Sequence, residues 1–388
     1  MILNFTEKEL RENKGINTLT EILQQPQMWI QTSQIIQENA AEIQKFLQKN
    51  LHPTTKVILT GAGTSEFVGS SLVRDLIVQG IDAQVIPTTD IVSNIEEYVN
   101  PKTPTILISF ARSGNSPESV ATFKMMNQFV EKIQHIIITC NKDGALLQVA
   151  TDQKNCLKIV LPEQTNDQSF AMTSSYSSMV VACLMVFNIF EFDRYVKRVE
   201  QLAVSVSLNI KTHYQEIAKL AQMQHERIVY LGSGNLNGIA QESHLKVLEL
   251  TAGAKTAFYN TPLGFRHGPK SVLNQESIVF LFMNQDPYKR VYDLDLLKEL
   301  SHQKQAKTLV VFDYKNNLET KALANFYFDC EFQEDSTALL GLNYIVLTQL
   351  YAFYKSLDNG KTPDNPWPSG LVNRVVAGVI IYEKEVLK

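Results

Sequence analysis

An apolar segment that ends in a glycine turn occurs twice in this chain. The run V-I-L-T-G-A-G-T reaches Gly61, and the run V-Y-L-G-S-G-N reaches Gly232, 171 residues later. Two further pairs of apolar segments lie 172 residues apart, Ile106 with Ile278 and Ile136 with Thr308. A near-constant spacing across three segments is typical of a duplicated domain. The sequence therefore predicts two tandem copies of one fold.

Each copy alternates between strand-like and helix-like segments. In the first copy, continuous Val, Ile and Leu runs predict strands at residues 56–60, 83–86, 105–110, 135–140 and 157–161. Runs of this kind are buried on both faces, which is the pattern of a parallel sheet with helices on each side. We therefore expect an α/β fold with two doubly wound parallel sheets.

The remaining segments set the domain limits. The first fifty residues predict a helical lead-in, because apolar side chains recur with a helical period from Trp29 to Leu47. Two long helical regions are expected at 177–224 and 335–357. The expected parts are a lead-in at 1–50, a first domain at 51–200, a second domain at 201–358 and a Pro-rich C-terminal tail at 359–388.

Composition excludes several classes of partner. The chain has 388 residues, 44% of them apolar, which is enough to bury two cores, and its net charge of −4 gives no footprint for nucleic acid or an anionic membrane. No stretch has the pattern of a membrane span or a cleavable signal, so we expect a cytoplasmic protein. The four cysteines lack metal-ligand spacing and are expected to be buried thiols, and we expect no metal.

Three charged residues share one face of a helix in the second copy. Glu242, Lys246 and Glu249 follow one another at spacings that place them on a single stripe bordered by apolar positions. They can be two ion pairs on a solvated helix face, which is the usual role of such spacing. Alternatively, one carboxylate is a catalytic base that the neighbouring ammonium keeps ionised.

A histidine follows this helix in a constrained loop. His267 precedes Gly268 and Pro269, and this dipeptide fixes the backbone at a turn. Alone, such a histidine is more often an ordinary loop residue than a catalyst. Its position after the charged helix also allows a catalytic role.

Hydroxyl-rich loops follow two strands of the first copy. Gly63, Thr64 and Ser65 end the first loop, and Ser113 to Ser116, which include Asn115, form the second before Pro117. Loops of this kind at helix N-termini bind phosphate, although each is also common as a plain strand-to-helix turn. A dinucleotide-binding fingerprint is disfavoured, because Glu66 occupies the position of its third glycine. A third hydroxyl-rich run, around Thr173 and Ser174, can be a sugar contact or a solvated helix start.

Taken together, E-x-x-x-K-x-x-E and the later H-G-P resemble the sugar isomerase (SIS) family, whose domains are flavodoxin-like αβα sandwiches. The similarity extends to the isomerase half of glucosamine-6-phosphate synthase and covers most of the chain after residue 50. It implies that Glu249 is the enolisation base, that Lys246 and Glu242 assist it, and that His267 opens the sugar ring. It also implies that Ser65, Ser113 and Ser116 bind the phosphate. The chain departs from the synthase at Ala111 and Arg112, so Arg112 is expected to supply a guanidinium to the substrate.

Long strings are similar to the stand-alone double-SIS proteins of AgaS type. They are residues 109–119, 265–271 and 372–382. The resemblance implies a deaminase that converts galactosamine 6-phosphate to tagatose 6-phosphate and ammonia. It leaves open a plain aldose/ketose isomerase, a deglycase and a non-catalytic sugar-phosphate-binding protein. No glutaminase segment precedes the first copy, so we expect no synthase activity.

The resemblance also implies the partners. The substrate is a hexosamine or hexose 6-phosphate, and no organic cofactor or metal is needed. We expect a homodimer in which His267 acts across the interface, and a tail that closes over the active site. The tail has no lysine where the synthase has one, and Arg374 is the nearest cation.

Overall fold

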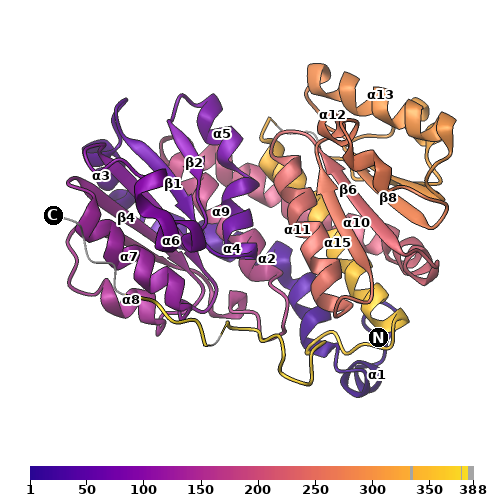
Figure 1. The fold of residues 1–388 in the computed structure, drawn as a ribbon, viewed down its shortest axis with the longest axis horizontal. Helices are drawn as coiled ribbons and strands as arrows, with labels where there is room; N and C mark the ends of the chain where they lie inside the picture. The colour runs from indigo at the N-terminus through magenta and orange to yellow at the C-terminus, as the bar shows by residue number, and fades with distance from the viewer. Residues whose placement is uncertain (333–334, 377, 383–388) are drawn as a thin grey trace.

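The computed structural model describes residues 1–332, 335–376 and 378–382. Within these residues the chain forms two five-stranded sheets in which neighbouring strands are parallel. The first sheet has the order β2-β1-β3-β4-β5 and the second has the order β10-β9-β8-β6-β7. These orders are the same when β6 to β10 are taken as the second copy of β1 to β5. The predicted pair of α/β domains is confirmed, and Figure 1 shows them side by side.

The strands lie close to their predicted positions. In the first copy they are β1 Lys56–Thr60, β2 Ala83–Val85, β3 Thr105–Ala111, β4 Ile133–Thr139 and β5 Cys156–Val160. In the second copy they are β6 Arg227–Gly232, β7 Thr256–Asn260, β8 Ser277–Phe282, β9 Thr308–Asp313 and β10 Phe326–Asp329. The pairing is also repeated, since Ile106 lies opposite Val57 in the first sheet and Ile278 lies opposite Ile228 in the second.

Each sheet contributes one face to a core that both copies share. Side chains alternate along a strand, so Val57 and Leu59 of β1 enter the shared core, whereas Ile58 between them packs under the outer helices. The same alternation puts Tyr230 of β6 into the shared core and Val229 on the outer face. The two copies therefore have separate outer layers but one continuous apolar centre.

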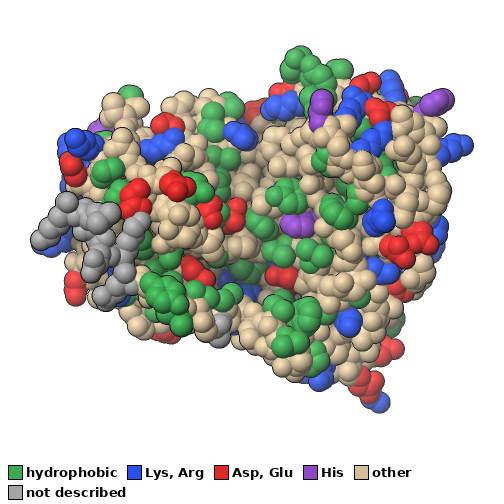
Figure 2. All heavy atoms as spheres, in the orientation of Figure 1, with side chains coloured by type: hydrophobic (Ala, Val, Ile, Leu, Met, Phe, Trp, Pro, Cys, Tyr) green, Lys and Arg blue, Asp and Glu red, His purple; other side chains and the backbone are tan. Residues whose placement is uncertain are grey.

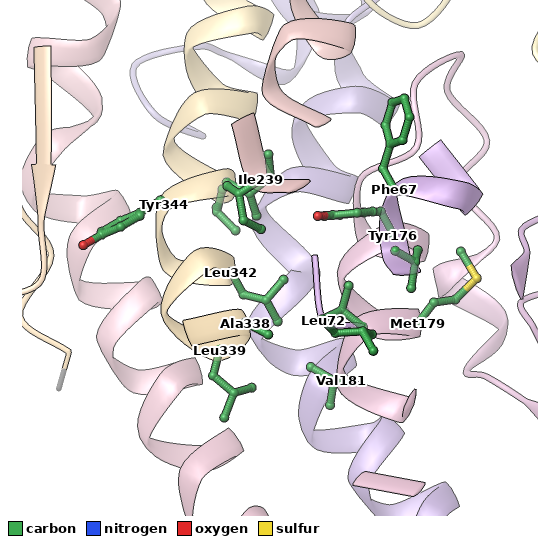
Figure 3. Close-up of a cluster of buried hydrophobic side chains, with 14 of the residues drawn as sticks. Phe67, Leu72, Tyr176, Met179, Val181, Ile239, Ala338, Leu339, Leu342 and Tyr344 are labelled. Carbon is green, nitrogen blue, oxygen red and sulfur yellow. The ribbon is translucent and has the colours of Figure 1, made fainter. Parts of the chain in front are cut away.

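Long helices fill the space between the sheets. They are α2 Ile16–Glu38, α9 Ser174–Phe187, α10 Phe192–Gln222, α11 Leu236–Leu250 and α15 Thr337–Asp358. Figure 3 shows side chains of both copies meeting there, with Leu72 and Val181 close to Ile239 and Leu342. Burial on all sides explains why α9 and α15 carry apolar residues around their whole circumference.

The remaining helices pack around the two sheets and the central layer. In the first half of the chain they are α1 Glu7–Glu12, α3 Ala40–Asn50, α4 Thr64–Ser70, α5 Val73–Val78, α6 Thr88–Tyr98, α7 Pro117–Phe129 and α8 Ala145–Val149. In the second half they are α12 Pro262–Phe265, α13 Pro287–Gln303 and α14 Leu318–Leu323. Helix α7 begins as predicted, with Ser116 accepting a hydrogen bond from the Ser119 amide and Pro117 in the first turn.

The helical lead-in is longer and more integrated than predicted. Helix α2 begins at Ile16, thirteen residues before the start of the apolar pattern, and ends at Glu38, where α3 follows in a new direction. Its buried face includes polar side chains that pair with other helices. Trp29 Nε1 donates to Ser177 Oγ at 2.9 Å, and Gln25 Nε2 donates to Gln349 Oε1 at 2.7 Å. The lead-in is therefore part of the central layer.

The helical region expected at 177–224 is two helices. Helices α9 and α10 meet at a bend of 84° around Asn188. Helix α10 then runs without interruption through residue 200, where the sequence predicted the boundary between the domains. The division into domains at 200 stays a prediction, but the boundary does not fall in a linker.

The C-terminal tail crosses from the second copy to the first, along the lower edge of Figure 1. Asp364 in the tail caps α2 by accepting the Asn17 and Thr18 amides at 3.2 and 2.7 Å. The Asp364 carbonyl also accepts the Phe170 amide at 3.0 Å. Residue 377, which belongs to the string 372–382, lies outside the described residues, as do residues 383–388.

No single helix in the described part of the chain is long and apolar enough to cross a bilayer. Within that part, only α9 and the helical segment 189–222 together have the length and composition of a span, and they are bent by 84° relative to each other. All four cysteines are free, and Cys140, Cys183 and Cys330 are buried.

Candidate active site

The candidate site lies where α11 of the second copy meets the carboxyl ends of strands in the first. Helix α11 packs closely on α4, because Gly238 lacks a side chain: a Cβ there would lie 2.5 Å from the Ser70 carbonyl carbon. In open parallel sheets the carboxyl ends of the strands are the usual place for ligands. The close approach of α11 brings its charged face to this edge.

The three charged residues of α11 form one compact cluster. Lys246 Nζ lies 3.1 Å from Glu242 Oε1 and 2.6 Å from Glu249 Oε2. It also donates to Thr64 Oγ1 at 3.0 Å, which joins the second copy to the first glycine loop. The side chains of Glu242 and Lys246 are fully buried, whereas that of Glu249 keeps 23% of its surface exposed. The interpretation as ion pairs on a solvated helix face is therefore wrong.

Burial and neighbouring charges shift these groups in opposite directions. Burial raises the pKa of Glu242 to about 7, against the effect of the Lys246 ammonium and with the effect of the Glu249 carboxylate. Burial alone would lower the pKa of Lys246, but the two carboxylates more than reverse this, and its pKa is raised. Lys246 is therefore a cation at neutral pH. The one carboxylate of the cluster that reaches the surface is Glu249.

The first glycine loop has the geometry of a ligand-binding turn. A Cβ at Gly61 would lie 2.4 Å from the Ser65 carbonyl carbon, so only glycine allows this tight turn. Gly63 has a φ of 55° and faces open space. Thr64 is bound to Lys246, and the hydroxyl of Ser65 is 3.9 Å from Met172 Sδ. The predicted phosphate loop and the charged cluster of α11 are thus neighbours.

Several polar groups of the second loop already make hydrogen bonds within the fold. Ser116 Oγ caps α7, and Asn115 Oδ1 accepts the Ala145 amide at 3.0 Å. Ser113 is held by its carbonyl, which accepts from Asn141 Nδ2 at 2.8 Å, and its Oγ accepts the Asn115 amide at 3.3 Å. The Ser113 hydroxyl keeps its proton for a further acceptor.

Arg112 is buried and bound to backbone carbonyls. Its Nη1 donates to Phe170 O at 3.1 Å, and its Nη2 donates to Arg374 O at 2.6 Å. Burial and then the Arg374 charge lower the pKa of Arg112, and the carboxylates of Asp167 and Glu249 act in the opposite direction. Arg112 therefore lies within electrostatic range of Glu249 while its donors hold the tail. The predicted contact between the Arg112 guanidinium and the substrate stays a prediction.

The third hydroxyl-rich run is organised by Asp167, which sequence reasoning missed. The Asp167 carboxylate accepts the Thr173 and Ser175 amides at 2.8 and 2.9 Å and the hydroxyls of Ser174 and Ser175. Asp167 lies seven residues before the first residue of α9, whereas a capping side chain usually comes from the residue directly before the helix. No local sequence motif therefore marks it. The hydroxyl of Ser174 is thus engaged within the fold, whereas Thr173 Oγ1 is buried without a hydrogen-bond partner among the described residues.

Arg374 reaches the same loop from the tail. Its Nε donates to the Asp167 carbonyl at 2.9 Å, and its Nη2 donates to Asn166 Oδ1 at 3.2 Å. The side chain of Arg374 therefore fixes the tail to the loop that caps α9. Its backbone carbonyl accepts the hydrogen bond from Arg112 Nη2.

His267 is exposed and has no bond to the cluster. Neither a hydrogen bond nor an ion pair joins its side chain to any other described residue, although its amide donates to Gly264 O at 3.0 Å. The flanking Arg266 pairs with Asp295 and Glu299 at 2.8 Å each, which holds the turn against α13. A single chain thus brings Glu242, Lys246 and Glu249 together with the two loops, but not His267. Among the described residues, no group of His, Cys, Asp and Glu is placed to hold a metal.

The raised pKa of Glu242 predicts a pH dependence of stability. The folded chain keeps this proton up to about pH 7, whereas the unfolded carboxyl loses it near its ordinary value of 4.5. The free energy of unfolding should therefore fall as pH rises through this window, by up to about 3 kcal/mol from this group. In Glu242→Gln that contribution should be absent in urea unfolding measured from pH 4.5 to 7.5. Glu200→Gln, on the exposed side of α10, is the control, and parallel curves for wild type and Glu242→Gln would contradict the assignment.

Known proteins resemble this chain over most of its length. The SIS domain family matches residues 50–189. The D-galactosamine-6-phosphate deaminase AgaS of Escherichia coli O157:H7 is 42% identical over 377 residues, which cover 95% of this chain and 96% of the relative. A Clostridium novyi NT protein, assigned as a tagatose-6-phosphate ketose/aldose isomerase, has a solved structure that matches with a TM-score of 0.96 at 39% identity and covers 99% of both chains.

A more distant structure shares the fold alone. The C-terminal domain of glucosamine-fructose-6-phosphate aminotransferase from Francisella tularensis matches with a TM-score of 0.74 at 16% identity, covering 90% of this chain and 98% of that domain. The matches at about 40% identity extend from end to end and include both sheets. The chain therefore belongs to the AgaS family of proteins with two SIS domains.

Proposed function

We propose that this protein is a galactosamine-6-phosphate deaminase, which hydrolyses its substrate to tagatose 6-phosphate and ammonia. The observation that carries the proposal is the position of the Lys246 ammonium between a buried Glu242 and a partly exposed Glu249, next to the loop of Thr64. This arrangement supplies a carboxylate base beside a fixed positive charge, which proton transfer at a carbon next to an imine or carbonyl requires. The name of the E. coli relative supports the same reaction.

The phosphate is the anchor of the proposed complex. We assign it to Ser65 of the first loop and to Ser113 and Ser116 of the second, near the N-terminus of α7. Backbone N–H groups and hydroxyls at a helix start favour an anion. Anchoring the phosphate leaves C1 and C2 of the open sugar free to reach Glu249, which converts remote binding energy into orientation.

The proposed reaction has three steps. His267 moves the proton that opens the sugar ring. Glu249 then takes the proton from C2 and returns it to C1, so that the amino-aldehyde passes through an enolamine to an imine at C2. Water adds to this imine, and ammonia leaves as the ketone of tagatose 6-phosphate forms. Lys246 stabilises the negative charge that develops on the oxygen atoms, and its ion pair holds Glu249 towards the sugar.

The other predicted residues have supporting roles in this proposal. Glu242 keeps Lys246 in place, and Gly63 lets the sugar approach the backbone. Arg112 and Arg374 position the tail over the sugar. Asn115, Thr173 and Ser174 shape the loops around the phosphate. Thr173 Oγ1 is buried and has no hydrogen-bond partner among the described residues.

We further propose that the enzyme acts in the cytoplasm as a homodimer, with His267 given by the partner chain. The exposure of His267 and the absence of a described contact to Glu249 favour this arrangement. A second copy would also cover the exposed Phe258, Tyr259 and Leu263, which lie on β7 and α12 near the same turn.

Substrate comparison tests the function. Galactosamine 6-phosphate should release ammonia at least tenfold faster, in kcat/KM, than tagatose 6-phosphate is isomerised to its aldose, because the amine gives an imine that water can hydrolyse. Ammonia is measured with a coupled dehydrogenase and the sugars by chromatography. The name of the C. novyi protein supports a second candidate, an aldose/ketose isomerase, which the same base would serve. Isomerisation without ammonia release from galactosamine 6-phosphate would establish that candidate instead.

Replacement of the base gives a direct test of Glu249. Glu249→Gln should lower kcat by about a thousandfold or more, with the affinity for the substrate changed less than about threefold, because the amide cannot take the proton but fills the same space. Single-turnover kinetics and calorimetric binding separate the two effects. Glu200→Gln, on the exposed side of α10, is the matched control. Turnover within tenfold of wild type would exclude Glu249 as the base.

Mixing two inactive variants tests the shared site. His267→Ala and Glu249→Gln should each be inactive, and after unfolding and refolding together in equal amounts they should recover about a quarter of wild-type activity. Half of the dimers are then mixed, and each mixed dimer has one complete site of two. A mixture without activity, although the mixed dimer is present by native mass spectrometry, would place His267 and Glu249 in the same chain.

A further inference from the structure

A cavity of about 820 Å³ lies between the two copies, away from the Glu249 cluster. It is lined by α5 of the first copy and by the carboxyl ends of β6 and β8 in the second, together with the start of α15 and the start of α10. In Figure 1, α5 and α13 flank this region at the upper edge, opposite the tail. Figure 2 shows the surface hollowed between the two halves. Its volume is in the range of pockets for small metabolites.

The cavity is the repeat-related counterpart of the candidate active site. In the active site, Lys246 of the second copy donates to Thr64, at the end of β1 in the first. In the cavity, Asn235, at the end of β6 in the second copy, donates to Asp75 of the first at 2.5 Å. Residue 235 lies 171 positions after residue 64, and residue 246 lies 171 positions after residue 75, which is the spacing of the repeat. The same contact is therefore made twice, with the copies exchanged.

The counterpart site lacks the residues that carry chemistry. The positions equivalent to Glu242 and Glu249 at this spacing are Ser71 and Val78. Val78 lines the cavity, and it cannot accept a proton. The cavity has the position of a sugar-phosphate site without a base, so it is suited to binding and not to turnover.

Two of the four described acidic residues that line the cavity, Asp75 and Asp286, are hydrogen-bonded within the fold. Asp75 accepts from Asn235 and from the Ser336 hydroxyl, and both oxygens are used. Asp286 caps α13 by accepting the Tyr288 and Lys289 amides at 2.9 and 3.2 Å. Asp286 and Pro287 begin α13 as Ser116 and Pro117 begin α7 in the phosphate-binding copy.

Basic side chains line the same cavity from several elements. They are Arg74, Arg194, Arg198 and Lys289. The guanidinium of Arg74 is exposed and makes no ion pair with another described residue. Arg194 pairs with Glu191 at 2.7 Å, and Arg194 and Arg198 each lie 3.0 Å from Asp335 Oδ2. The side chains of Glu191 and Asp335 are 55% and 83% exposed, so water weakens these ion pairs. Arg198 is held in place at 4.9 Å over the Tyr195 ring.

We propose that this cavity is a second, non-catalytic site for a small phosphorylated metabolite. The phosphate binds Arg74, Arg194 and Arg198, because guanidinium groups bind phosphate in a bidentate way and a dianion replaces the exposed carboxylates of Glu191 and Asp335. The remaining volume accepts the carbon chain. This site goes beyond the proposed deaminase activity and does not depend on it.

Binding stoichiometry tests the site. Tagatose 6-phosphate is titrated by calorimetry into a Glu249→Gln background, in which turnover cannot consume it. We expect two molecules per chain, and one molecule per chain in the additional double variant Arg74→Glu/Arg194→Glu. Tagatose without its phosphate should not bind the cavity. The control pair Lys211→Glu/Lys321→Glu changes net charge equally on exposed positions and should keep two molecules per chain.

Hydrogen exchange locates the second molecule. Tagatose 6-phosphate should slow amide exchange at residues 73–79 and 286–290, and this protection should be lost in Arg74→Glu/Arg194→Glu while protection near residues 113–119 remains. One molecule per chain with no protection at 73–79, or equal loss in the control pair, would overturn the proposal. Absence of ammonia release by the wild-type chain would overturn the deaminase proposal and leave the cavity result standing, so the two proposals fail separately.

Discussion

The buried ammonium of Lys246 is the interaction on which the structure of the site depends. Taking such a charge out of water costs several kcal/mol, and only close oxygen partners offset the cost. Two of these partners, Glu242 and Glu249, are on the same helix, but the third is Thr64 of the other copy. Separating the copies would therefore expose or unpair this charge. The contact that joins the two halves is also the contact that forms the candidate catalytic group.

The strands were predictable from sequence because burial on both faces of a parallel sheet leaves a continuous apolar run. Helix α2 was not predicted to its full length for the opposite reason. Its first half buries polar residues, among them Thr18 and Gln25, whose partners are Asp364 and Gln349 far along the chain. Local periodicity counts these positions as exposed, so the apolar pattern starts only at Trp29. Similarly, the bend at Asn188 has no proline or glycine to mark it.

The same distinction applies to the candidate site. Glu242, Lys246 and Glu249 were found because their spacing on one helix is local information. The engagement of Arg112 by the Arg374 carbonyl joins residues 262 positions apart, and nothing near either residue indicates it. Asp167 was missed because it caps α9 from a loop and not from the capping position. The roles of Arg112 and Asp167 therefore required the three-dimensional arrangement.

The internal repeat explains why the molecule has one candidate catalytic centre and not two. Duplication of the fold creates two equivalent crossings, where a helix of one copy meets strand ends of the other. At one crossing the helix carries Lys246 with its carboxylates, and the facing loops have hydroxyls and glycines. At the other the helix carries Asp75, whose charge already occupies the place that a ligand anion would take at the α15 N-terminus. An anion entering there would therefore bind the arginines of the wall, and the proposed chemistry belongs to the crossing that has Lys246.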